Sequence, residues 1–86
     1  MKHASHPAIV VRLKRAHGHL GSVLAMFAGG RSCLDLAQQL HAVEKAVSNA
    51  KRELIQDHIE HCLGDGTDGG DPKTALREFK VLSKYL

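Results

Sequence analysis

SCLDLAQQLHAVEKAVSNAKRELIQDHIEHCL, residues 32–63, contains neither glycine nor proline. Hydrophobic side chains recur along it at alternating intervals of four and three residues, at Leu36, Leu40, Val43, Val47, Ala50 and Leu54. This spacing predicts one amphipathic helix, which Ser32 and Asp35 begin with a capping-box pattern. Such a helix extends about 47 Å at 1.5 Å per residue, more than a compact domain of this size requires. We therefore expect partner helices to cover the hydrophobic seam along its whole length.

A second amphipathic pattern precedes this segment. Its apolar side chains are three or four residues apart, with His17 at the one position where an apolar residue is missing, and they are Val10, Leu13, Leu20, Leu24 and Phe27. Ser5 and Pro7 suit the start of a helix, and the pair Gly29-Gly30 suits its end. The pattern predicts a helix over about residues 6–28 that buries this stripe, with His17 in the core.

The remainder of the chain predicts a glycine-rich turn and a short third helix. Residues 64–71 contain four glycines and three aspartates and predict a flexible turn. Asp71 and Pro72 suit the start of a helix over about residues 72–85. Its apolar face comprises Leu76, Phe79, Leu82 and Leu86. The sequence therefore predicts an all-α fold, with residues 1–86 forming one helical domain.

Composition limits what such a chain does. It has 86 residues, of which 43% are hydrophobic and 3% aromatic, so its own core is small and we expect an oligomer. No carboxylate pair, Ser-His-Asp set or phosphate-binding loop is apparent, and we do not expect an enzyme. Two cysteines are too few for a disulfide-stapled scaffold, and no signal or membrane-spanning segment is apparent. We therefore expect a cytoplasmic protein with reduced thiols and no membrane partner.

Three positions carry side chains that suit a transition metal ion. His58 and Cys62 are four residues apart in the predicted helix, so both project from the same side. Imidazole and thiolate suit Zn(II), Cu(I), Ni(II) or Co(II) rather than Mg(II) or Ca(II). Cys33 precedes His58 by 25 residues, about 37 Å along the helix axis, which is too far to share one ion within a chain. If two copies of this helix pack antiparallel, Cys33 of one subunit meets His58 and Cys62 of the other.

Basic side chains predict an anionic partner. Twelve Lys and Arg against nine Asp and Glu give a formal net charge of +3. The candidates for DNA contact are Arg12, Lys14, Arg15, His19, Lys45, Lys51 and Arg52. An oligomer repeats these charges, so several phosphate contacts would make binding strongly dependent on salt. Aromatic side chains are not interleaved with them, which favours double-stranded DNA over stacking on single strands.

Several motifs together resemble a known family. They are RLKRAHGHL at residues 12–20, QQLHAV at residues 38–43, and Cys33 followed by His58-x-x-x-Cys62. With these motifs, nearly the whole chain resembles the CsoR/RcnR/FrmR family of bacterial transcriptional repressors. The resemblance implies three helices per subunit, an antiparallel dimer and a dimer-of-dimers tetramer. It also implies that basic surface binds operator DNA, and that an inducer releases the DNA and derepresses efflux or resistance genes.

The resemblance also implies roles for individual residues. By position, Cys33, His58 and Cys62 would bind one inducer ion per intersubunit site, and Glu78 would be the carboxylate that supports a ligand. A Cys-His-Cys set resembles the Cu(I) sensors of the family. Its Ni(II) and Co(II) sensors add an N-terminal nitrogen, and the candidates for that ligand are His3 and His6.

Other interpretations stay open at this point. A formaldehyde-responsive repressor of the same family would use an N-terminal proline amine, and Lys2 at the second position argues against it. A metal-binding helical module that does not bind DNA fits the same ligands, and so does a helical assembly whose cysteines only fill its core. A second metal site would use His17, His19 and His41, of which His19 replaces the glutamine usual in the family.

Overall fold

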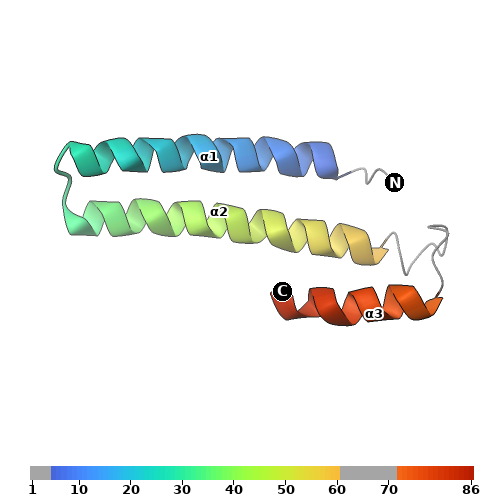
Figure 1. Ribbon diagram of the computed structural model, residues 1–86. Helices are drawn as coiled ribbons and strands as arrows, with labels where there is room; N and C mark the ends of the chain where they lie inside the picture. Colours follow the sequence, from blue (N-terminus) through green and yellow to red (C-terminus); the bar gives the residue numbers. More distant parts are fainter. Residues whose placement is uncertain (1–4, 61–71) are drawn as a thin grey trace.

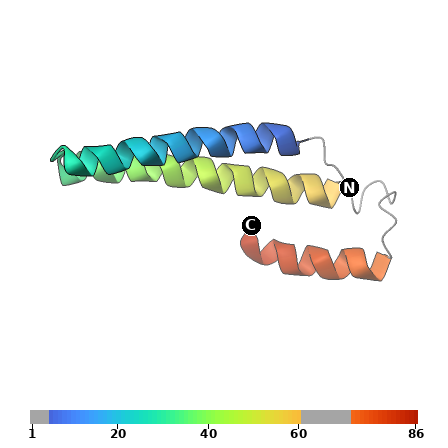
Figure 2. The same ribbon diagram turned by 45° about the horizontal axis from the view of Figure 1, so that its top comes forward.

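Helices α1 (His6–Ala28) and α2 (Cys33–Ile59) form an antiparallel hairpin in the computed structural model, which describes residues 5–60 and 72–86 (Figure 1). Helix α3 (Pro72–Leu82) runs back along the C-terminal end of α2 and continues as the 3₁₀ helix η2 (Ser83–Tyr85). Figure 2 shows the hairpin from a second direction, in which α3 again lies next to that end of α2. Every regular element in the described residues is helical, and the prediction of an all-α subunit with three helices is confirmed.

The start of α2 follows from its capping residues. Ser32 is the N-cap, and its Oγ accepts a hydrogen bond from the backbone N–H of Asp35 at 3.1 Å. The helix therefore begins at Cys33, one residue after the first residue of the predicted segment. Ser5 is the N-cap of α1, but its side chain makes no capping hydrogen bond. The predicted end of the second helix at residue 63 and the predicted turn over 64–71 lie outside the described residues.

Two glycines end α1 and reverse the chain. Gly30 has a φ of +73°, a conformation that favours glycine because it has no Cβ. The N–H of Gly30 donates to the carbonyl of Phe27, and the N–H of Arg31 donates to that of Met26. This is the hydrogen-bond pattern of the Schellman motif, which satisfies the last carbonyls of a helix. The reversal brings the start of α2 beside the end of α1.

Side chains seven residues apart hold the hairpin together. On α1 the buried side chains are Ile9, Ala16 and Val23. On α2 the corresponding buried side chains are Leu36, Val43 and Ala50. Val23, Leu36 and Val43 form one cluster, against which Met26 packs. Seven residues are close to two helical turns, so each set lies on one line that faces the other helix.

The buried stripe of α1 is not the one that the sequence predicted. Val10 is 47% exposed and Leu24 is 65% exposed, and His17 is exposed as well, so the prediction of His17 as a core residue is wrong for the single subunit. The hairpin instead buries Ala16, the residue immediately before His17. The small side chain of alanine allows close approach of the two helices, but apolar spacing gave Ala16 no weight.

A second set of apolar side chains lies on one outer face of the hairpin. Each member follows a buried residue by four positions, and the members are Leu13, Leu20, Phe27, Leu40, Val47 and Leu54. Four residues correspond to a rotation of about 40° around a helix, and in antiparallel helices these rotations point to the same side. These six side chains are 41–56% exposed and are called the apolar stripe below. The predicted seam of α2 is therefore divided between the hairpin and this outer face.

The subunit is elongated, with principal extents of 54 × 23 × 14 Å. None of the helices in the described part of the chain combines the length and hydrophobicity that crossing a bilayer requires.

Truncation of a buried valine tests this packing. Val23→Ala removes a side chain that is 1% exposed, and the lost burial and the cavity should cost about 1–3 kcal/mol of unfolding free energy. Urea unfolding at one fixed protein concentration measures the loss, because the stability of a self-associating protein depends on its concentration. Val11→Ala is the control, since Val11 is 49% exposed on the same helix. Equal losses for the two variants would contradict the assignment of the core.

Candidate metal site and basic face

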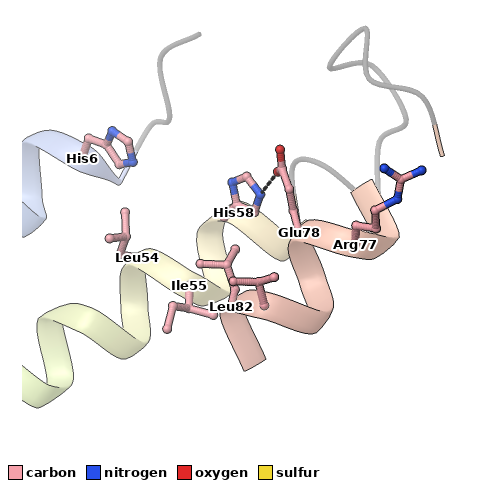
Figure 3. A pocket seen from close by; sticks show the side chains of 8 residues that line it. His6, Leu54, Ile55, His58, Arg77, Glu78 and Leu82 are labelled. Carbon is pink, nitrogen blue, oxygen red and sulfur yellow. Dashed lines mark hydrogen bonds and ion pairs between the residues drawn. The ribbon is translucent and has the colours of Figure 1, made fainter. Parts of the chain in front are cut away.

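His58 lies in the last turn of α2 and contacts an acidic side chain of α3. Nε2 of His58 is 2.9 Å from Oε2 of Glu78 (Figure 3). A carboxylate hydrogen-bonded to one ring nitrogen fixes the orientation and tautomer of an imidazole, and metal-binding histidines are commonly supported in this way. The structure thus places Glu78, which the resemblance implied as a carboxylate that supports a ligand, next to His58. The contact also attaches α3 to the end of α2.

His6 lines the same hollow as His58. The hollow has a volume of about 500 Å³ at the end of the hairpin, where the start of α1, the end of α2 and helix α3 meet. Half of its lining residues are aliphatic, and the full set is His6, Leu54, Ile55, His58, Arg77, Glu78, Val81 and Leu82. Figure 3 shows both imidazoles on the same side of the labelled aliphatic residues. The imidazoles of His6 and His58, both possible nitrogen ligands of a metal ion, therefore border one cavity.

Cys33 lies at the opposite end of α2 from this hollow. It is the first residue of the helix, is exposed and carries a free thiol. The 25 residues of straight helix that separate it from His58 extend about 37 Å. Within the described residues of one chain, no three His, Cys, Asp or Glu side chains are grouped closely enough to hold a metal ion. The predicted ligands Cys62 and His3 lie outside the described residues.

Three of the basic candidates line one hollow between α1 and α2. This hollow has a volume of about 310 Å³ and is lined by Arg12, Arg15, Ala16, His19, Ala46 and Asn49. Nε2 of His19 is 2.6 Å from Oε1 of Gln39 across the two helices. The residues that line this hollow, together with Gln39 and Glu53, which contact two of them, are called the basic face below. Arg12 and His19 each follow a buried residue by three positions, which is a rotation of about −60° around the helix. The residues of the apolar stripe are rotated by about 40° in the other direction, so the basic face and the apolar stripe lie on opposite sides of the hairpin.

The other basic candidates lie elsewhere. Lys45, Lys51 and Arg52 line a depression along α2 together with His41. Lys14 is exposed and lines neither hollow. The seven candidates thus fall into a group at the α1/α2 groove, a group along α2, and one isolated lysine.

The second histidine site considered above does not form within one subunit. His19 borders the basic face and contacts Gln39, whereas His41 lines the depression along α2. His17 is exposed. In the described part of a single chain these side chains do not gather into a group that could hold a metal ion.

Asn49, Gln39 and Glu53 belong to the basic face but were not singled out from the sequence. Asn49 lines the hollow, and the other two contact His19 and Arg12 respectively. Their signal in the sequence is weak, because each contact joins residues 20 or more positions apart. Gln39 and Glu53 each follow a buried residue by three positions, Leu36 and Ala50 respectively. This heptad position predicts that both side chains lie at the edge of the hairpin.

Comparison with known proteins identifies similar chains. The sequence profile described as metal-sensitive transcriptional repressor matches residues 5–84. The copper-sensing transcriptional repressor CsoR of Bacillus subtilis is 36% identical over 78 residues, which cover 90% of this chain and 77% of that protein. CsoR of Mycobacterium ulcerans is 32% identical over 78 residues, covering 91% and 67%. The copper-sensing transcriptional repressor RicR of Mycobacterium tuberculosis is 29% identical over 68 residues, covering 74% and 71%. No solved structure gave a significant match.

Removal of the contact between His58 and Glu78 should loosen α3. In Glu78→Ala the backbone amides of residues 73–82 should exchange with solvent roughly two- to fivefold faster, because an exposed ion pair or hydrogen bond contributes up to about 1 kcal/mol. Hydrogen–deuterium exchange with mass spectrometry measures the change. Lys80→Ala serves as the control, since Lys80 is an exposed residue of the same helix that does not line the hollow. Unchanged exchange in Glu78→Ala would show that this contact does not hold α3.

Proposed function

The chain belongs to the family of metal-sensitive transcriptional repressors, and we propose that it binds operator DNA and releases it when a transition metal ion binds a Cys/His site shared by two subunits. One observation carries the proposal. Cys33 and His58 stand at opposite ends of the same helix, on a hairpin whose apolar stripe is uncovered in the single subunit. A second antiparallel copy would cover the stripe and bring the two ends together.

The apolar stripe supports a dimer of hairpins. Six large apolar side chains in two parallel rows, 41–56% exposed, are more than scattered surface residues. A two-fold dimer presents the same surface on both subunits, so a stripe shared by two antiparallel helices can pack against its own copy. The product is an antiparallel four-helix bundle. Pairing of two such dimers into a tetramer, which the resemblance implied, is part of the proposal.

The proposed site combines side chains from two subunits. Cys33 of one subunit would join His58 and Cys62 of the other, giving one metal ion per intersubunit site. Glu78 would hold the imidazole of His58 in place through the contact at 2.9 Å. Two thiolates and one imidazole form a soft donor set, which fits the chemistry of a thiophilic transition metal.

We propose Cu(I) as the inducer. The similar proteins from Bacillus subtilis and Mycobacterium ulcerans are named copper-sensing, and a three-coordinate site rich in thiolate suits Cu(I). A second candidate is Ni(II) or Co(II), because these ions bind more nitrogen donors. The position of His6 on the same hollow as His58 favours that candidate, and His3 is a further nitrogen donor three residues earlier.

The DNA-binding surface is proposed to comprise the basic face and the basic side chains along α2. Arg12, Arg15 and His19 share a groove, and a tetramer would present this groove four times. Phosphate contacts would supply most of the affinity and make it fall steeply with salt. Choice of sequence would then rest on a few contacts to base edges and on the shape of the DNA.

Metal binding and DNA binding would be coupled through the packing of the helices. A metal ion bound by the start of α2 in one subunit and the end of α2 in the other favours one arrangement of the two hairpins. If that arrangement spaces the basic faces poorly for phosphates, DNA affinity falls by the coupling free energy, typically about 1–3 kcal/mol. By linkage, DNA weakens metal binding by the same amount.

Replacement of Cys33 separates the two activities. The Cys33→Ala variant should bind a duplex of the protein's own promoter as tightly as the wild type, because Cys33 lines neither of the hollows that the basic candidates line. It should not release the duplex when Cu(I) is added anaerobically, because the site has lost one thiolate. Fluorescence anisotropy of the labelled duplex measures both properties, with Ala37→Ser, one turn further along α2, as the control.

Two results would contradict the proposal in different ways. A Cys33→Ala protein that still releases DNA on addition of Cu(I) would remove Cys33 from the site. A wild-type protein without salt-dependent DNA binding would contradict the repressor function and favour a metal-binding module.

A further inference from the structure

Arg12 differs from the other basic candidates in its surroundings. Its Nη1 donates to Oε2 of Glu53 on α2, which joins the two helices of the hairpin by an ion pair. The seven candidates for DNA contact all lie in the described part of the chain, and among them Arg12 alone forms an ion pair there. The positive charge of Arg12 is therefore partly neutralised within the subunit.

The ion pair lies at the edge of the basic face. Arg12 lines the hollow with Arg15, His19 and Asn49, and Glu53 approaches it from α2. The side chain of Arg12 is 55% exposed and that of Glu53 is 33% exposed. A phosphate group that reaches the hollow can therefore reach the guanidinium of Arg12.

The ion pair is poorly suited to a role in stability. Exposed pairs between flexible side chains contribute little to folding, because solvent screens the charges and the side chains lose freedom. The hairpin is already held by its row of buried apolar residues. A carboxylate beside an arginine does, however, reduce the attraction of that arginine for phosphate, since both anions compete for the same donors.

We propose that Glu53 competes with a DNA phosphate for Arg12 and thereby lowers the affinity of the repressor for DNA. This inference rests on the proposed function. In the free protein Arg12 is held by Glu53, and on DNA it exchanges the carboxylate for a phosphate oxygen. Glu53 is thus a positioning residue that acts through Arg12. Glu53 offers Arg12 another partner when the protein leaves DNA. Dissociation therefore requires less free energy than it would for an unpaired arginine.

The variant Glu53→Gln tests the competition, because it keeps the shape of the side chain and removes its charge. Binding of the full-length variant to a fluorescein-labelled mixed-sequence duplex is measured by anisotropy over a series of salt concentrations. Affinity should rise roughly two- to fivefold for each Arg12 that meets DNA, the factor that corresponds to an exposed ion pair. Glu60→Gln removes the same charge from the C-terminal end of the same helix, where Glu60 is exposed, makes no ion pair within the described residues and lines neither basic hollow, and it should change affinity less.

A double-mutant cycle identifies Arg12 as the group through which Glu53 acts. Arg12→Gln should weaken binding and lower the slope of log affinity against log salt by about one for each phosphate that Arg12 neutralises in the wild type. In the Arg12→Gln background, Glu53→Gln should have no further effect. Circular dichroism and thermal unfolding of each variant verify that the hairpin is intact.

Three outcomes would overturn the inference. They are an affinity of Glu53→Gln no higher than that of Glu60→Gln, a weaker affinity than the wild type, and an effect that persists without Arg12. Absence of salt-dependent DNA binding by the wild type is a different result, since it contradicts the proposed function itself.

Discussion

The length and straightness of α2 determine most of what this subunit can do. A helix is rigid over 27 residues, so side chains at its two ends cannot approach each other within one chain. Cys33 is at one end, and His58 with Glu78 is at the other. Any site that uses both ends needs a second chain running in the opposite direction. The same helix carries three members of the apolar stripe, which gives the second chain a surface on which to pack.

The hairpin places its apolar stripe and its basic face on opposite sides. Heptad spacing places small and branched apolar residues between α1 and α2, and the positions on either side then face outward in opposite directions. One side has the leucine-rich apolar stripe, and the other has Arg12 and His19 with their partners on α2. The proposed assembly and the proposed DNA contact therefore use different surfaces. A change in how two hairpins pack nevertheless alters the spacing between their basic faces, which is the physical basis of the proposed coupling.

The capping and turn residues could be predicted from sequence, but the choice of buried stripe could not. Ser32, Asp35 and the pair Gly29-Gly30 act locally, so their roles follow from a few neighbouring residues. On α1 two adjacent stripes are apolar, and the hairpin buries the one that contains Ala16 because small residues permit close packing. The contacts of His58 with Glu78 and of Arg12 with Glu53 span 20 and 41 positions. For the first contact, the resemblance implied that Glu78 supports a ligand but did not say which one, and the second contact became visible only in the folded hairpin.

Complementation between two inactive variants tests most directly whether two chains share the site. Cys33→Ala and His58→Ala subunits, each unable to complete a site alone, are unfolded together, refolded as a mixture and titrated anaerobically with Cu(I). In a mixed antiparallel dimer, Cys33 from the His58→Ala subunit would meet the intact His58 and Cys62 of its partner, which restores one of the two sites. We expect tight Cu(I) binding to appear only in the mixture, with half the wild-type stoichiometry in the mixed dimers. A mixture that binds no more Cu(I) than the separate variants would contradict the antiparallel, shared site.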